Sequence, residues 1–489
     1  MREMIALFNQ SDLWREICTF CLILKDNYIK QLTVCVVLCT IFCIYLRRVK
    51  LKLNSPPCCR GWIPFLGCAL DFGKSPLTFI GQKKDEHGPL FSVYVAGQTL
   101  HILTDQTMYQ VFFESPCLDF ELTVFDAITK AGLINKDKFI ERHSKLYHAV
   151  KGTLSPLRLD DVTGAICGKF RKQFDVFIPK EERFELYGMV KCCMYAPIAE
   201  TLYGDCGFSF NDKQNYLQFI EQFECFDENF ELGVQLPSIF IRKWTQARNS
   251  LLKRMSEKFF KSTHKDNMTL LDELNSVTGE DAPNYAVLVM LAALSNAVPI
   301  VFWAIARILT DERVKQKLYQ ELNELRSEKP NNDFDLSFED LKQLPYLRCC
   351  VQEALRLQSE GIVGRKIVKD INLLGYDLQK GDLLVLCPYW AHRNEQFFPD
   401  PEAFKPERWE GVSFARMSYR QGFIAFGGGR SQCPGRYFAH SVMQKFVASF
   451  LLQFHCTPHT PVPAASMMHL VGVQHPTSDF IVSCSKRNL

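Results

Sequence analysis

One glycine-rich loop that carries a cysteine constrains this chain more than any other feature. The run reads Phe-Gly-Gly-Gly-Arg-Ser-Gln-Cys-Pro-Gly over residues 426–435, and an apolar helical stretch from Tyr437 to about Phe454 follows it. Glycines remove side chains where a backbone must approach a large flat group. A thiolate in such a loop is a strong soft ligand for iron. We therefore predict that Cys433 ligates a metal, although a buried structural cysteine is the commoner reading of any single cysteine.

The other cysteines give no comparable signal. The chain of 489 residues has 20 cysteines, and its three adjacent cysteine pairs lack the spacing of a zinc site. No disulfide framework is expected in a chain of this length, which favours a reducing compartment. The net charge of +3 and the lack of a long basic block give no reason to expect a nucleic-acid partner.

An apolar segment near the start of the chain predicts a membrane anchor. Residues 28–46 are apolar apart from Lys30 and Gln31, and about 20 apolar residues span a bilayer. A basic cluster follows at once: Arg47, Arg48, Lys50 and Lys52. The positive-inside rule then places the rest of the chain in the cytosol. We expect an N-terminal extension and anchor over residues 1–53 and one large domain over residues 54–489.

A proline-rich segment over residues 56–64 separates the two parts. Proline fixes the backbone and ends a helix, so this segment predicts a stiff hinge after the anchor. A cleaved signal peptide is the alternative to an anchor. The basic residues lie on the wrong side of the apolar run for that reading, and no clear cleavage site follows it.

A second apolar stretch predicts a long buried helix. Residues 286–306 contain no charged side chain, which also suits a second membrane span. Ser295, Asn296 and Pro299 near the centre favour a buried helix over residues 285–309. Pro299 cannot donate a hydrogen bond to the carbonyl of Ser295, so we predict that the helix opens at Ser295–Asn296.

The cysteine loop resembles the haem-binding loop of the cytochrome P450 family. In that family a Phe begins the loop, a Gly stands four residues before the Cys, and another Gly stands two residues after it. The chain departs once, because Ser431 occupies a place where the family usually has Arg or His. The resemblance implies haem b with Cys433 as the axial iron ligand. It also implies that these residues surround the cofactor: Phe426, Gly429, Arg430 and Gly435.

The resemblance gives roles to three residues outside the loop. Glu353 and Arg356 are one helical turn apart, and Arg408 lies in a Pro-Glu-Arg-Trp run that is similar to a conserved element of the family. These three side chains would form a buried network that supports the fold and the haem loop, because a third member supplies hydrogen bonds that a buried ion pair needs.

Basic residues outside the loop are candidates to hold the haem propionates. Arg365 stands where the family often has an arginine that contacts a propionate, and the alternative is a surface arginine. The Trp-x-x-x-Arg element that usually supplies a second contact is missing. The basic residues of 141–152 are possible substitutes, which we do not rank: His143, Lys145, His148 and Lys151.

Ser295 and Asn296 stand where the family usually has an acid followed by Thr. The resemblance implies that both act in proton delivery during catalysis, because an amide can orient a water chain and a hydroxyl can join it. The alternative role for Asn296 is to cap the hydrogen bonds that Pro299 breaks. Both readings remain open.

The resemblance narrows to one branch of the family. The runs over residues 284–285, 294–299 and 302–303 look like the sterol 7α-hydroxylase and prostacyclin synthase branch. Further runs over residues 57–64, 227–237 and 469–473 are similar to oxysterol 7α-hydroxylases within it. The activity implied is 7α-hydroxylation of an oxysterol, 24-hydroxycholesterol, in sterol and bile acid metabolism. The alternatives are a haem-thiolate isomerase that resembles prostacyclin synthase and a non-enzymatic protein that binds haem or sterol.

The expected fold is mainly α with small β-sheets, as in the cytochrome P450 family, with a single haem-thiolate catalytic domain and an N-terminal membrane anchor. Strands are predicted over residues 90–95, 101–103 and 383–387. The implied partners are molecular oxygen and an NADPH–cytochrome reductase in the endoplasmic reticulum membrane. Basic residues near the cysteine loop would dock the reductase, unless they are only solvated charge: Arg420, Arg430 and Arg436.

Overall fold

The computed structural model describes residues 28–48, 54–63, 65–178, 182–204, 213–261, 269–329, 335–466 and 471–487. The predicted extension over residues 1–27 and half of the basic cluster after the anchor lie outside these residues. The described part is mainly helical with three small sheets, as the sequence predicts. The chain forms two compact units, each assembled from stretches that are far apart in the sequence.

The first unit comprises Met1–Met108, Ser115–Asp119 and Gly364–Leu386. Its main sheet has six strands in the order β1-β2-β3-β9-β6-β4. These strands are β1 (Cys58–Cys59), β2 (Leu90–Val95), β3 (Gln98–Leu103), β9 (Leu383–Leu386), β6 (Val363–Ile367) and β4 (Leu118–Asp119). A hairpin of β7 (Ile371–Leu373) and β8 (Tyr376–Leu378) and three helices complete the unit: α3 (Tyr28–Arg48), α4 (Ala69–Lys74) and α5 (Pro76–His87).

The three predicted strands are confirmed, although β3 begins three residues earlier and β9 ends one residue earlier than expected. Strands β2 and β3 pair antiparallel through a two-residue turn in which Ala96 and Gly97 both have positive φ angles, of 48° and 85°. Such a turn follows the twist of the two strands. Strand β3 then pairs in parallel with β9, so a segment from late in the chain completes this sheet.

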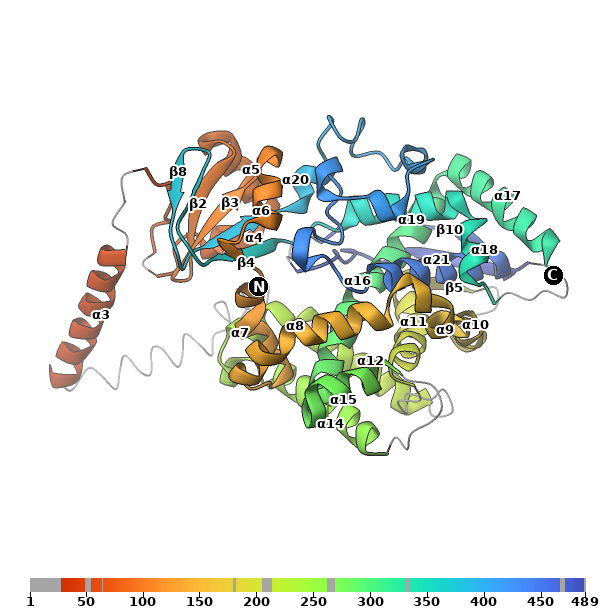
Figure 1. The fold of residues 1–489 in the computed structure, drawn as a ribbon, viewed down its shortest axis with the longest axis horizontal. Coiled ribbons are helices and arrows are strands. Elements are labelled where there is room, and N and C mark those ends of the chain that lie inside the picture. The colour runs from red at the N-terminus through yellow and green to blue at the C-terminus, as the bar shows by residue number, and fades with distance from the viewer. Residues whose placement is uncertain are drawn as a thin grey trace. The chain divides into compact units, whose positions relative to one another are not determined.

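The second unit comprises Tyr109–Glu114, Phe120–Val363 and Cys387–Leu489. Its helices before the longest one are α6 (Tyr109–Glu114), α7 (Glu121–Gly132), α8 (Lys136–Thr153), α9 (Leu159–Thr163), α10 (Ile166–Phe177), α11 (Leu186–Tyr203), α12 (Lys213–Glu228), α13 (Phe230–Gln235), α14 (Arg242–Lys261) and α15 (Leu270–Thr278). The helices that follow are α16 (Ala282–Thr310), α17 (Glu312–Glu328), α18 (Phe338–Lys342), α19 (Pro345–Gln358), α20 (Pro388–His392) and α21 (Arg436–Gln453). Helix α16 packs against α11, α14, α15, α19 and α21 and forms the spine of this unit (Figure 1).

Helix α16 is the predicted buried helix, and it begins and ends slightly beyond the expected bounds. Within the described residues, Leu270–Thr310 is the one helical stretch long and apolar enough to cross a membrane, and 67% of its most apolar window is buried. That burial supports a core helix. The helix is continuous through Pro299, so the predicted opening at Ser295–Asn296 is wrong. Pro299 removes only one donor, and packing on several neighbouring helices keeps the helix intact.

A small three-stranded sheet lies in the same unit, in the order β10-β11-β5. Its strands are β10 (Phe454–Pro458), β11 (Ile481–Lys486) and β5 (Arg183–Glu185). Cys456 and Cys484 stand directly opposite each other on β10 and β11 and form a disulfide. The expectation of no disulfide is therefore wrong for this pair, because the sequence does not reveal the register that brings the two cysteines together.

Candidate functional site

The cysteine loop is shaped by a backbone hydrogen bond and by two glycines in the left-handed region. The N–H of Cys433 donates to the carbonyl of Phe426 at 3.0 Å and closes the loop just before α21. Gly427 and Gly429 have φ angles of +67° and +63°, which side chains other than glycine rarely adopt. A Cβ on Gly429 would lie 2.3 Å from the carbonyl oxygen of Phe113 in α6. Gly429 is thus required by its packing against α6, a reason that sequence reasoning did not foresee.

Cys433 is an exposed residue of the loop. Desolvation raises the pKa of its thiol, while the N–H of Gly435 and the charge of Arg436 act in the opposite direction. A soft metal ion would displace the thiol proton there and bind the thiolate.

Tyr147 supports the loop from α8, and sequence reasoning missed it. Its hydroxyl donates to the carbonyl of Gln432, immediately before Cys433, at 2.7 Å. The signal available was an aromatic residue among the basic candidates of residues 141–152. Of those candidates, His143 packs its ring on Phe139 with the ring centroids 4.6 Å apart. The other three are exposed on α8: Lys145, His148 and Lys151.

The basic residues around the loop differ in exposure. Arg430 is exposed, and Arg420 is 62% exposed beside Glu114. Arg436 is partly buried and donates to the hydroxyl of Tyr437 at 2.8 Å. Two of the three predicted docking residues therefore present their charge to solvent.

Glu353 is the centre of a buried hydrogen-bond network. Its Oε1 accepts from Arg356 Nη2 at 2.7 Å and from Arg408 Nε at 3.0 Å, and its Oε2 accepts from Arg356 Nε at 2.9 Å. The N–H of Lys405 and the indole of Trp409 each donate at 2.9 Å as well. Glu353 and Arg356 are both fully buried. Five donors on one carboxylate offset the cost of burying its charge.

Arg365 lies on β6, in the first unit, whereas Cys433 lies in the second. The arginine is only 4% exposed, which argues against the surface alternative. Its guanidinium donates to the carbonyl of Gly364 at 2.9 Å. Burial lowers the pKa of Arg365 to about 10, and nearby Asp119 partly opposes that shift.

One side of α16 is accessible while the rest of the helix is buried. The accessible side includes Leu288, Ala292 and Asn296, which are spaced four residues apart and so lie on one face. Asn296 donates from Nδ2 to the carbonyl of Ala292 at 2.8 Å. A Cβ on Gly472, whose φ angle is +85°, would lie 2.6 Å from Asn296 Oδ1. Asn296 therefore lies against a closely packed loop at this face.

Ser295 has a different environment from its neighbour. It is buried, and its hydroxyl donates to Asp227 Oδ1 of α12 at 2.6 Å. The two predicted catalytic residues thus differ in burial, since Ser295 is buried and Asn296 is partly accessible. Sequence reasoning included Asp227 in a run that is similar to oxysterol 7α-hydroxylases but did not connect it with Ser295, because their contact depends on the packing of two helices and joins residues 68 positions apart in the sequence.

A protein-family model described as Cytochrome P450 matches residues 56–482 of the chain. Among curated proteins, the 24-hydroxycholesterol 7-alpha-hydroxylases of Homo sapiens and Mus musculus are 34% and 32% identical to it, over 91% of this chain and 96% of theirs. Cytochrome P450 7B1 of Mus musculus is 25% identical over 88% of this chain and 90% of its own length.

Among solved structures, a retinoic acid-bound cyanobacterial CYP120A1 superimposes with a TM-score of 0.72. The match covers 89% of this chain and 100% of that chain at 20% identity. At 20% identity this similarity is evidence for the fold alone.

Proposed function

The chain belongs to the cytochrome P450 family, and we propose that it is a haem-thiolate monooxygenase that hydroxylates 24-hydroxycholesterol at carbon 7 from the α face. The observation that carries this proposal is the extended similarity to relatives named for that reaction, over 91% of the chain. The site is compatible with it, because the chain presents an accessible thiol in a glycine loop.

The residues present fit a haem group. Cys433 supplies the soft axial ligand, and the loop from Phe426 to Gly435 holds it in place through the Cys433–Phe426 backbone bond. The loop glycines leave no side chain to obstruct the approach, since the nearest atom to a Cβ on Gly427 would be 3.8 Å away. When bound, haem supplies the oxygen activation and hydrogen abstraction that no side chain can perform. The protein's own residues bind the sterol, exclude water and supply protons.

Binding of a rigid apolar sterol fits the side chains that border the accessible face of α16. Ala292 and Leu288 offer apolar surface there. Helix α7 adds Phe125, which packs on the core, and the following Leu133, which is 54% exposed. Apolar walls discriminate weakly between sterols, whereas a polar group that meets a side-chain hydroxyl discriminates strongly. We place that polar group in residues 227–237.

The cellular setting follows from the same proposal. Apolar residues 32–42 of α3 are largely exposed, as an anchor in the endoplasmic reticulum membrane requires. The catalytic domain would then lie in the cytosol, as a single-pass protein. Electrons would come from NADPH through a membrane-bound reductase, with Arg420 and Arg430 as its docking charges. The hydroxylated sterol would enter bile acid synthesis.

A haem-thiolate isomerase of the prostacyclin synthase kind remains the second candidate, because Asn296 is compatible with it. Oxygen and NADPH separate the two activities, since a peroxide isomerase needs neither. Two relatives that match over 91% of this chain are named as hydroxylases, which favours the monooxygenase.

The experiment is reconstitution of the purified, haem-loaded chain with a reductase, NADPH and a panel of sterols, with identification of each product. We expect a 7α-hydroxylated product and a much higher kcat/KM for 24-hydroxycholesterol than for cholesterol. Equal turnover of the two sterols, or hydroxylation away from carbon 7, would refute the proposed substrate. Product formed without NADPH would refute the monooxygenase.

A further inference from the structure

A short hydrogen bond joins two helices on the buried side of α16. Ser295 Oγ lies 2.6 Å from Asp227 Oδ1, and the residues are 9% and 5% exposed. This distance is that of a short O–H···O hydrogen bond. The low exposure of both residues shields the pair from bulk solvent.

The surroundings of Asp227 favour its protonated form. Within the described part of the chain, Asp227 makes no ion pair. The groups that act on it electrostatically are the carboxylates of Glu224 and Glu228, the ammonium group of Lys191 and the hydroxyls of two tyrosines of α11: Tyr187 and Tyr195. Burial raises the pKa of Asp227 to about 7 and the carboxylates add to this, while the Ser295 hydrogen bond and Lys191 oppose it. A buried carboxyl group in such a position takes up a proton rather than remain an unpaired charge.

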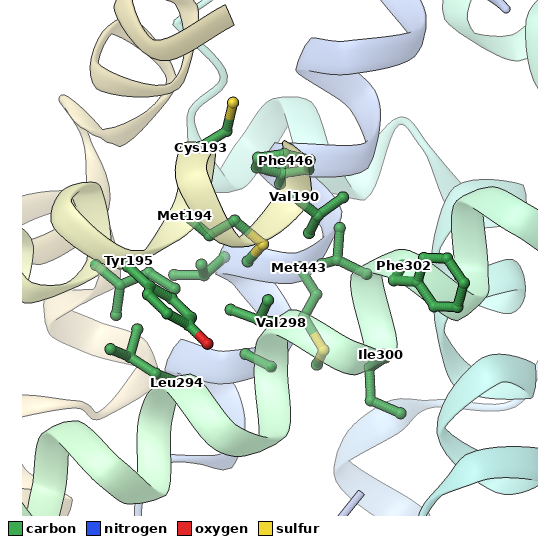
Figure 2. Close-up of a cluster of buried hydrophobic side chains, with 14 of the residues drawn as sticks. Val190, Cys193, Met194, Tyr195, Leu294, Val298, Ile300, Phe302, Met443 and Phe446 are labelled. Atoms are coloured by element: carbon green, nitrogen blue, oxygen red, sulfur yellow. The ribbon is translucent and has the colours of Figure 1, made fainter. Parts of the chain in front are cut away.

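A partly exposed ion pair lies on the helices around Asp227. Lys191 of α11 and Glu224 of α12 form an ion pair at 2.6 Å, and their side chains are 15% and 30% exposed. Glu224 is one helical turn from Asp227 on the same helix. The packing of α11 on α16 includes an apolar cluster, which Figure 2 shows with Val190, Met194, Leu294 and Val298. The same two helices are also joined by a hydrogen bond from the Tyr203 hydroxyl to the carbonyl of Ala286 at 2.8 Å.

Ser295 is the member of this buried pair that lies on α16. Asn296, the next residue, belongs to the accessible side, and Pro299 leaves the Ser295 carbonyl without its helical donor. A free carbonyl can hold a water molecule at this point of the helix. The Ser295 hydroxyl can donate in either direction by rotation about χ1.

We propose that Asp227 and Ser295 together hold a proton and pass it to the accessible side of α16 during the reaction proposed above. The Ser295 hydroxyl, which donates to Asp227 in the structure, first turns towards a water on that side. Its proton then moves to that water while the protonated Asp227 carboxyl, now the donor, passes its proton to Ser295 Oγ. This leaves a carboxylate on Asp227, which a solvent proton neutralises by way of Lys191 and Glu224. Asp227 is thus a positioning residue that acts through Ser295, and it replaces the acid that α16 lacks. The inference rests on the proposed function.

The first test is infrared spectroscopy, which does not depend on turnover. The haem-loaded wild type at pH 6 should show a protonated carboxyl band that Asp227→Asn lacks and that disappears by pH 8. Glu360 and Glu321 also have raised pKa values, of about 7 and about 6, so the wild-type minus variant difference is needed to isolate Asp227. The control is Glu221→Gln, an exposed position on the same helix. A difference spectrum without the band at pH 6 would overturn the proposal.

The second test measures sterol product per NADPH consumed. Asp227→Asn and Ser295→Ala should each lower this ratio by roughly tenfold or more, with peroxide as the excess product. The double variant should be no worse than either single variant, because the residues act as one unit. The wild-type ratio should fall between pH 6 and pH 8, whereas that of Asp227→Asn should not change with pH.

The haem content of each variant should match that of Glu221→Gln, which excludes a folding defect. A ratio for Asp227→Asn equal to that of this control would overturn the proposal. If the wild type forms no sterol product at all, the proposed function fails, and the infrared spectrum alone decides whether the pair holds a proton.

Discussion

Replacement of Glu353 by Gln should unfold or nearly unfold the second unit. The substitution removes the carboxylate that pairs with the buried guanidinium of Arg356, which is 0% exposed. It also replaces one carboxylate oxygen by an NH₂ group, which can only donate hydrogen bonds. That NH₂ group would then face the donors that Oε1 or Oε2 now accepts from. The carbonyl groups that Arg356 also contacts, those of His392 and Pro401 at 2.7 Å, cannot neutralise its charge.

The size of the effect follows from this burial. Removing one partner of a buried ion pair costs about 3–5 kcal/mol, because an uncompensated charge remains. The whole free energy of unfolding of a domain is about 5–15 kcal/mol. A loss of about 4 kcal/mol lowers the ratio of folded to unfolded protein roughly a thousandfold. We therefore expect little soluble, haem-loaded protein at 37 °C and a large fall in the urea midpoint, followed by tryptophan fluorescence.

Glu257→Gln is the matched control. Glu257 pairs with Lys253 across one turn of α14 at 3.8 Å, and these side chains are 54% and 78% exposed. An exposed pair of this kind contributes less than about 1 kcal/mol. Equal urea midpoints for Glu353→Gln and Glu257→Gln would refute the reasoning, because the argument depends entirely on burial.

Four further outcomes test the site. Cys433→Ser should abolish the red-shifted Soret band of the reduced carbon monoxide complex, and a variant that keeps this band would remove Cys433 as the ligand. Gly429→Ala should lower stability in urea far more than Gly411→Ala. Both glycines have positive φ angles, but only a Cβ on Gly429 would meet backbone, 2.3 Å away. Equal losses of stability would show that backbone conformation alone matters. Asn296→Ala should lower product per NADPH with little change in sterol affinity, and unchanged coupling would make Asn296 a structural cap. Finally, because the folded pKa of Asp227, about 7, exceeds its ordinary value of 3.8, its contribution to stability is present below about pH 4 and is lost as pH rises through 7. Asp227→Asn should therefore remove a fall of up to about 4 kcal/mol in unfolding free energy over that range, and parallel pH curves for variant and wild type would contradict this.

Local pattern was sufficient to predict much of the fold. Apolar runs predicted α16 and α21 to within a few residues, and short strand-like runs predicted β2, β9 and the second half of β3. These features depend on neighbours along the chain, so the sequence contains the information directly. The single departure within α16 was its continuity through Pro299, which is decided by packing from other helices.

The site was predictable only where a motif encodes it. The loop around Cys433 and the hydrogen-bond partners Glu353 and Arg356 are written in short runs of residues. Contacts that depend on how helices pack were not predicted. Tyr147 bonds to a carbonyl 285 residues away, and Asp227 meets Ser295 across 68 residues. No periodicity reports such contacts, because side-chain direction on two separate helices must be known first.

The pairing of β3 with β9 has a consequence for how the protein is made. Leu103 pairs with Leu386, so β3 leaves the ribosome about 280 residues before its partner. At a synthesis rate of about 5–20 residues per second, the edge of β3 waits roughly 15–60 s for β9. An unpaired strand edge recruits other strands, and chain closure over such a separation is slow. Newly made chains should therefore depend on chaperones during this interval, and any truncation before residue 383 should leave an aggregation-prone sheet.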